Sequence, residues 1–116
     1  LVLIDGLTES AAVEMVASLV RARPSVVLAG ERTSGACDRH RGEIPVVFTT
    51  PRLQIPVIVS LMDIGIVHSP DCEPGIGIAP DLEVPWSIEE FQSGRDPWRE
   101  VVDGWRSGSA SDPPSR

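Results

Sequence analysis

The sequence predicts an α/β fold: a parallel strand–helix–strand unit followed by a β-rich segment and two short C-terminal helices. The first observation is an apolar run at residues 1–4, a helical pattern over residues 8–22 and a second apolar run at residues 25–29. Two strands joined through such a helix lie parallel in one sheet, with a right-handed crossover. The second observation is a series of β-rich runs within residues 44–67. The third is a pair of helix-start signals near the C-terminus.

The predicted helix begins with Thr8 as its N-cap, because a threonine hydroxyl can accept a hydrogen bond from an amide of the first turn. It ends near Ala22, since Pro24 cannot continue a helix. Apolar residues at positions i, i+3, i+4 and i+7 predict one buried stripe along it. The residues of this stripe are Ala12, Met15, Val16 and Leu19.

Ser10 falls in the first turn of that predicted helix. Unpaired amides and the positive end of the helix dipole point outward there, and they stabilise an alkoxide or a developing oxyanion. The backbone amide of Ala11 is a plausible oxyanion donor. Two interpretations of Ser10 stay open on these residues alone: a nucleophile, or an ordinary serine that tolerates the first turn.

Residues 30–43 are polar, glycine-bearing and charged, and they predict an exposed loop. The β-rich runs that follow predict strands at residues 44–49, 53–61 and 64–67. Pro56 lies inside the second run and indicates an edge strand or a break, because proline cannot donate to a β-ladder. Residues 69–77 predict a loop rich in proline and glycine.

Two short helices are predicted near the C-terminus. Ser87 and Glu90 form a capping box, and Asp96 is an N-cap followed by Pro97 at the first helical position. The three tryptophans of this region, Trp86, Trp98 and Trp105, are expected to anchor the helices by packing.

The length of 116 residues predicts one domain, residues 1–106, with a disordered tail at residues 107–116 that has almost nothing to bury. The sequence starts at Leu1 directly in an apolar run, without methionine, so we expect a piece of a longer chain. The formal net charge of −7 argues against a general nucleic-acid or anionic-membrane surface. No apolar run approaches the roughly 18 residues of a membrane span.

Cys37 and Cys72 lie 35 residues apart and form no CxxC pair. They form either a disulfide or two unrelated thiols, and the spacing does not decide between these alternatives. His40 and His68 do not complete a convincing zinc spacing with them. No metal or other cofactor is therefore expected.

Three motifs occur in order along the chain. They are Ser-Ala-Ala-Val-Glu at residues 10–14, Gly-Glu-Arg-Thr-Ser-Gly at residues 30–35 and Gly-Ile-Ala-Pro-Asp-Leu-Glu-Val-Pro at residues 77–85, with Gly-Arg-Asp-Pro at residues 94–97. In this order the chain resembles the C-terminal processing (tail-specific) serine peptidase family, which is related to interphotoreceptor retinoid-binding protein and the tricorn protease core. The resemblance covers roughly residues 1–105.

The resemblance implies a fold, a partner and an activity. The fold would be the second half of a ClpP/crotonase-like ββα core, with the rest of the catalytic domain supplied upstream. The activity would be hydrolysis of a polypeptide substrate through Ser10, the position that matches the family's nucleophile, with the Ala11 amide at the oxyanion. Many members of the family are exported or membrane-associated.

The chain departs from the family at the general base. Members of the processing type carry a lysine where this sequence has Ala36, and the sequence contains no lysine at all. Arginine cannot replace it, because it stays protonated. In the tricorn-like branch a histidine from upstream is the base, and His40 is a local candidate, although a surface-loop histidine is the simpler interpretation. The alternative function is a non-catalytic binding protein on the same core.

Two acidic residues of the motifs have open roles. Glu31 is either an orienting acid near the site or a loop carboxylate that pairs with Arg32 or accepts hydrogen bonds from backbone amides. Asp81 follows Pro80 and is expected to form a turn before a strand.

Overall fold

The computed structural model describes residues 1–23, 25–42, 44–66 and 72–108. Its elements in chain order are β1 (Val2–Ile4), α1 (Ala11–Ala22), β2 (Leu28–Gly30), β3 (Arg39–Arg41), β4 (Pro45–Thr49), β5 (Pro56–Ser60), β6 (Asp63–Gly65), β7 (Leu82–Glu83), α2 (Ile88–Ser93) and α3 (Pro97–Arg106). The α/β class, the small parallel sheet and the two short C-terminal helices predicted from the sequence are all present.

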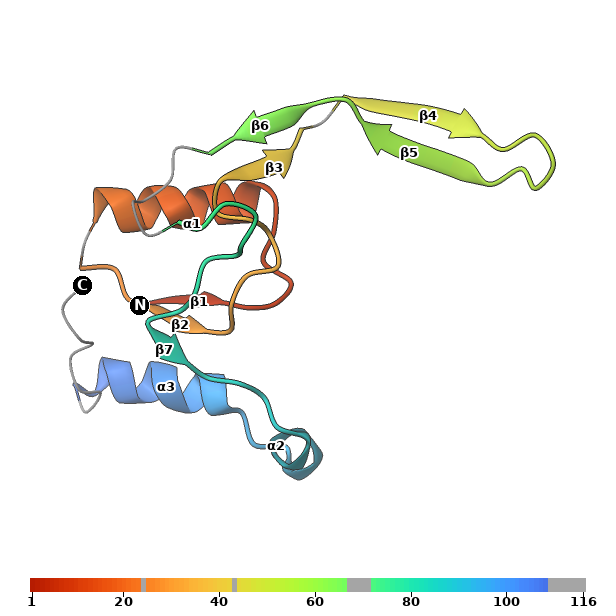
Figure 1. Cartoon of the computed structure of the whole chain (residues 1–116). Helices are drawn as coiled ribbons and strands as arrows, with labels where there is room; N and C mark the ends of the chain where they lie inside the picture. Colours follow the sequence, from red (N-terminus) through yellow and green to blue (C-terminus); the bar gives the residue numbers. More distant parts are fainter. Residues whose placement is uncertain (24, 43, 67–71, 109–116) are drawn as a thin grey trace.

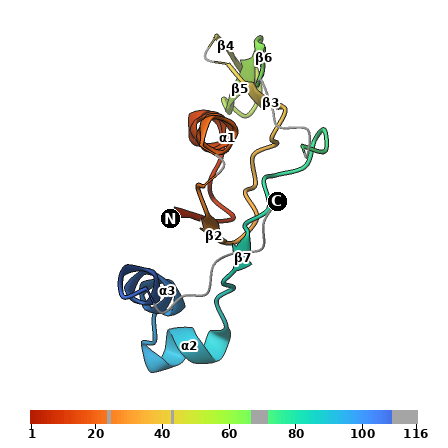
Figure 2. The ribbon, with the colours of Figure 1, turned by 90° about the vertical axis from the view of Figure 1, so that its left-hand side faces the viewer.

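A three-stranded parallel sheet with the order β1-β2-β7 lies at the centre of the fold. Val2 pairs with Leu28 and Ile4 with Gly30, so the predicted parallel unit is confirmed. Helix α1 covers one face of this sheet, and α3 lies on the other side (Figures 1 and 2). The chain is thus layered as helix, sheet and helix, and the β1–α1 turn is held at the carboxyl end of β1.

The core lies between α1 and the sheet. Ile4, Val16 and Leu28 form one buried cluster. Val13 and Ala17 form a second cluster with Ile66, just beyond β6. The predicted stripe on α1 is therefore wrong except at Val16. The helix carries apolar residues on two adjacent sides, and its contacts with both the sheet and Ile66 select the side that contains Val13 and Ala17. Ala12 and Met15 are exposed, and Leu19 is half-buried.

The prediction of an exposed loop over residues 30–43 is wrong at residues 39–41. These residues form β3, which pairs antiparallel with β6 through Arg39–Gly65, His40–Ile64 and Arg41–Asp63. The partner strand, β6, lies far along the sequence, so the composition of residues 30–43 does not indicate the pairing. The predicted loop at residues 69–77 falls partly outside the described residues, as do His68 and the end of the last predicted strand.

Strands β4 and β5 form an antiparallel ribbon that extends away from the rest of the molecule (Figure 1). We call residues 44–62 the arm. Pro56 is the first residue of β5, so of the predicted edge strand or break the structure has an edge strand that begins at this proline. The radius of gyration of 17.9 Å exceeds the roughly 13 Å of a compact domain of this size, because the arm projects.

Both C-terminal helices begin as predicted. The Ser87 hydroxyl accepts from the Glu90 amide while the Glu90 carboxylate accepts from the Ser87 amide, and Asp96 caps α3. The indole N–H of Trp98 donates to the Val84 carbonyl oxygen at 2.9 Å, which attaches α3 to the end of β7. Trp86, in contrast, is 43% exposed and is not a buried anchor. The predicted tail lies outside the described residues except for residues 107 and 108.

Within the described ranges, no helix combines the length and the apolar character that crossing a bilayer requires.

Candidate active site at the turn between β1 and α1

A closed four-residue turn connects β1 to the segment before α1. The Thr8 hydroxyl donates to the Asp5 carboxylate at 2.7 Å and accepts from the Asp5 amide at 3.1 Å. The Thr8 amide also donates to the Asp5 carbonyl oxygen at 3.0 Å. The prediction that Thr8 caps the helix is therefore wrong, because Asp5 engages its hydroxyl. The helix begins two residues later than predicted from that cap.

Ser10 occupies the N-cap position of α1 in an unusual backbone conformation. Its φ is 55° and its ψ is −131°, and its side chain makes no capping hydrogen bond. A positive φ favours glycine, since the Cβ atom of any other residue crowds the backbone. Strained residues of this kind cost about 1–3 kcal/mol and cluster at functional sites. Ser10 is exposed, so its hydroxyl is accessible from solvent.

The start of α1 supplies donors beside Ser10. The Ala11 amide is the first of the helix, where backbone N–H groups have no intrahelical acceptor. The Ser10 carbonyl oxygen accepts from the amides of Val13 and Glu14 at 3.1 and 3.3 Å, which fixes the residue to the helix. Ser10 thus lies between the closed turn and the helix, at the residue where the chain enters α1.

The loop at residues 30–35 packs directly on this turn. The Gly35 amide donates to the Thr8 carbonyl oxygen at 3.1 Å. A Cβ atom added at Gly35 would lie 2.8 Å from Glu9 Cα and 2.7 Å from Val13 Cγ2, so only glycine permits this approach. The second sequence motif therefore contacts the backbone just before Ser10 and the Val13 side chain just after it.

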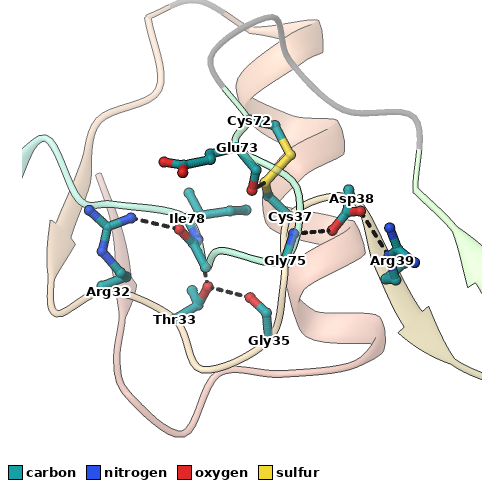
Figure 3. Close-up of a disulfide and its surroundings, with 11 residues drawn as sticks. Arg32, Thr33, Gly35, Cys37, Asp38, Arg39, Cys72, Glu73, Gly75 and Ile78 are labelled. Carbon is teal, nitrogen blue, oxygen red and sulfur yellow. Dashed lines mark hydrogen bonds and ion pairs between the residues drawn. A yellow bond between two sulfur atoms is a disulfide. The ribbon is translucent and has the colours of Figure 1, made fainter.

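The third motif interlocks with the second. The Thr33 amide donates to the Ile78 carbonyl oxygen at 3.1 Å, and the Ile78 amide donates to the Thr33 hydroxyl at 2.8 Å. Thr33 is 3% exposed, and its hydroxyl also donates to the Gly35 carbonyl oxygen (Figure 3). A Cβ atom at Gly77 would overlap the Thr33 carbonyl oxygen. The three motifs, distant in the sequence, thus form one contact network.

A disulfide between Cys37 and Cys72 closes this network at its edge, with the two Cα atoms 5.8 Å apart (Figure 3). Of the two alternatives that the sequence left open, the structure has the disulfide. The Asp38 carboxylate accepts from the Gly75 amide at 2.9 Å beside it. This hydrogen bond, together with the neighbouring Arg39, lowers the pKa of Asp38 below its ordinary value.

His40 on β3 faces α1 rather than Ser10. Its Nε2 atom lies 3.2 Å from the carboxylate of Glu14, one helical turn beyond Ser10, and its Nδ1 atom lies 3.1 Å from the Arg41 carbonyl oxygen. The contact with the Arg41 carbonyl raises the pKa of His40, partial burial opposes this, and Glu14 adds to the increase. Because acceptors engage both ring nitrogens, His40 has no free nitrogen to accept a proton from Ser10.

The pairing between Glu14 and His40 could not be predicted from the sequence. Glu14 was identified as the acid of the first motif, but its partner His40 lies on β3, a segment that was predicted to be a loop. Among the described residues, none forms a hydrogen bond to the Ser10 hydroxyl.

The remaining motif acids have structural roles. Glu31 accepts from the Trp86 amide at 3.4 Å, in agreement with the interpretation of a carboxylate bound to backbone amides. Asp81 does more than form a turn. Its carboxylate accepts from the Leu28 amide and its own amide donates to the Leu28 carbonyl oxygen, both at 2.8 Å, so it holds the start of β2. Ala36 forms an isolated β-bridge with Gly77.

A hollow of about 750 Å³ lies on the α3 side of the sheet, lined by Leu3, Trp86 and Trp98 among others. Ser10 is not among its lining residues, but Asp5, Gly6 and Leu7 are, so the hollow borders the turn between β1 and α1. Within the described part of the chain, no group of three or more His, Cys, Asp or Glu residues is arranged to hold a metal ion.

No protein-family model matches this chain, and no curated protein matches it.

Proposed function

We propose that this chain carries the nucleophilic part of a serine peptidase active site. Ser10 is the nucleophile, the Ala11 amide is an oxyanion donor, and the substrate is a polypeptide. The observation that supports the proposal most directly is the backbone of Ser10, with a φ of 55° at the turn between β1 and α1.

A purely structural role does not account for this serine. The conformation favours glycine, and the hydroxyl makes no capping hydrogen bond that would offset the strain. An exposed hydroxyl at a helix N-terminus, held rigidly by the surrounding motif loops, has the properties that a nucleophile requires. A positive φ without a compensating hydrogen bond supports a chemical role for this serine.

The proposed reaction proceeds through an acyl-enzyme. Ser10 Oγ attacks the scissile carbonyl carbon and its proton passes to a general base, which leaves a tetrahedral oxyanion near the Ala11 amide. The intermediate collapses, the C–N bond breaks, and the amine departs with the proton from the base. Water then hydrolyses the ester by the same steps and regenerates Ser10.

The general base comes from another segment of polypeptide under this proposal. The chain has no lysine, its arginines stay protonated, and both nitrogens of His40 are engaged. The resemblance to the tail-specific peptidases agrees with this arrangement, since a longer ClpP/crotonase-like core would supply the base from upstream.

A second function, binding without turnover, is favoured by one specific observation. Ala36 replaces the family's lysine and participates in a β-bridge with Gly77, so the position serves the fold rather than proton transfer. A protein of this kind would retain the site geometry around Ser10 without reacting.

Active-site labelling separates the two functions. A fluorophosphonate should label Ser10 in a longer protein that contains this chain, and Ser10→Ala should lower casein turnover by several orders of magnitude, up to about 10⁶-fold. Ser93→Ala changes an exposed serine on α2, outside the three motifs, and is the matched control, with labelling and turnover unchanged. An adduct at another residue, or full activity of Ser10→Ala, would refute the nucleophile, and the absence of any adduct would favour the binding protein.

The strain on Ser10 can be tested on the 116-residue chain itself. Ser10→Gly should be more stable than Ser10→Ala by about 1 kcal/mol, because only glycine adopts a positive φ without steric cost. Urea denaturation of both variants measures the difference. If the two variants are equally stable, Ser10 has an ordinary conformation in solution and the main support for the proposal is lost.

A further inference from the structure

The arm is apolar on both of its faces. Directly opposed residues of an antiparallel pair point to the same side, and successive residues alternate. The pairs Val46–Val59 and Phe48–Val57 therefore share one face, and Val47–Ile58 lies on the other. Val47 is 59% exposed and Ile58 is 70% exposed, so the second face is the more open of the two.

Such a ribbon is unusual on a soluble surface. A two-stranded hairpin is marginally stable unless a face is packed, and soluble monomers rarely expose a large contiguous apolar patch. Ten large apolar side chains within residues 44–62 are between 38% and 73% exposed. These side chains lie on both faces of the ribbon and in the segments at its two ends.

The distribution of charge indicates what covers this surface. The arm contains one charged residue, Arg52, and none of the 17 acidic residues of the chain. The net charge of −7 is thus +1 on the arm and −8 on the remainder. The bodies of two copies therefore carry like net charge, whereas their arms carry almost none.

The projection of the arm also favours a second copy (Figure 1). Each strand of the ribbon has five residues, which span about 17 Å. Arms that overlap side by side hold the two acidic bodies apart by a comparable length. Screening at physiological salt acts over about 8 Å, so repulsion between the bodies is weak at that separation.

We propose that two copies of this chain form a closed twofold dimer through their arms, with the Val47–Ile58 faces packed against each other. A twofold axis places the same patch of both copies in contact, and a patch without charge of either sign at its centre is compatible with itself. The proposal is independent of the peptidase activity, because the arm contains no residue of the candidate site.

Sedimentation of the 116-residue chain over a range of concentrations tests the dimer. As the concentration increases, the mass should rise from 12.5 kDa to twice that value. The dissociation constant of the dimer should fall as salt increases, because salt screens the repulsion between the acidic bodies. Val47→Glu should weaken the dimer at least about 10-fold, since it places two carboxylates in an apolar contact. Met15→Glu makes the same change at an exposed position on α1 and should leave the dimer intact.

Ile58→Thr is measured in parallel, because threonine keeps strand propensity if the charged variant fails to fold. It should also weaken the dimer while circular dichroism stays unchanged. A chain that is monomeric at all concentrations and salt levels would overturn the proposal. A dimer that resists both arm variants, or an open-ended series of oligomers in place of a dimer, would also overturn it.

Discussion

The body around Ser10 and the arm are held together in different ways. In the body, three distant segments meet through named hydrogen bonds, through glycines that permit close backbone approach, and through a disulfide. The arm is a ribbon whose strands contact one another in register, with both faces open to solvent. The body therefore depends on particular residues at particular positions, whereas the arm depends on β-propensity and apolar composition.

The difference indicates how each region can change. A substitution in the body affects several segments at once, because Thr33 alone bonds to both Gly35 and Ile78. A substitution on the arm affects its neighbour across the ribbon and whatever partner covers it. Stability should therefore be concentrated in the body, and association in the arm.

Removing the disulfide and truncating Ile4 should have the largest effects of the changes compared here. The double variant Cys37→Ala, Cys72→Ala should lose about 3–4.7 kcal/mol of unfolding free energy, the range expected for closed loops of 15 to 100 residues. Urea denaturation measures the loss, and the reduced wild-type chain is the control, since it should match the variant. A loss below about 1 kcal/mol would show that the hydrogen bonds of the network are sufficient without the disulfide.

Truncation of one isoleucine in each region compares them directly. Ile4 is 1% exposed and Ile58 is 70% exposed. Ile4→Ala should cost about 2–5 kcal/mol, because it leaves a cavity between β1 and α1, whereas an exposed position usually stays within about 0.5 kcal/mol. Thermal denaturation below the concentration at which copies associate measures both. Equal losses would mean that the arm is buried even in the monomer.

The contact between Glu14 and His40 should give the smallest effect. The pKa of His40 is raised, so the folded chain binds the proton more tightly than the unfolded chain does. The added stability is present below the unfolded pKa of about 6.5 and is lost as the pH rises through the folded value.

NMR titration of the His40 ring measures this pKa directly. Glu14→Gln should lower it only in part, since the contact with the Arg41 carbonyl, the larger cause, remains. Glu9→Gln removes a carboxylate from the same turn without touching the ring, and it should leave the titration unchanged. A pKa that does not respond to Glu14→Gln would place the two side chains apart in solution.

Local signals in the sequence were sufficient for part of this fold. The parallel pairing of β1 and β2 follows from two apolar runs around a helix, and the caps at Ser87 and Asp96 act within a few residues. The buried side of α1 could not be predicted, because Ile66 selects it from far along the chain. Strand β3 could not be predicted either, because its residues have little β-propensity of their own and its partner strand, β6, lies far along the chain.

The candidate site, too, could be predicted only in part from the sequence. Ser10, Ala11 and the motif loops were identified from the sequence, but the positive φ of Ser10 was not, because serine has no preference for that conformation. Thr8 was misassigned as a cap because the competing acceptor, Asp5, precedes it by only three residues and forms a tighter local turn.

The disulfide also closes a covalent loop that runs from Cys37 to Cys72 and carries β3, the arm and β6. The two ends of this loop meet at the disulfide. Outside the loop, Ala36, the residue before Cys37, forms a β-bridge with Gly77. The entropy of closing such a loop changes by only about 0.6 kcal/mol when its length doubles. Insertions or deletions along the arm can therefore alter its reach while the chain on either side of the disulfide keeps its register and continues to support Ser10.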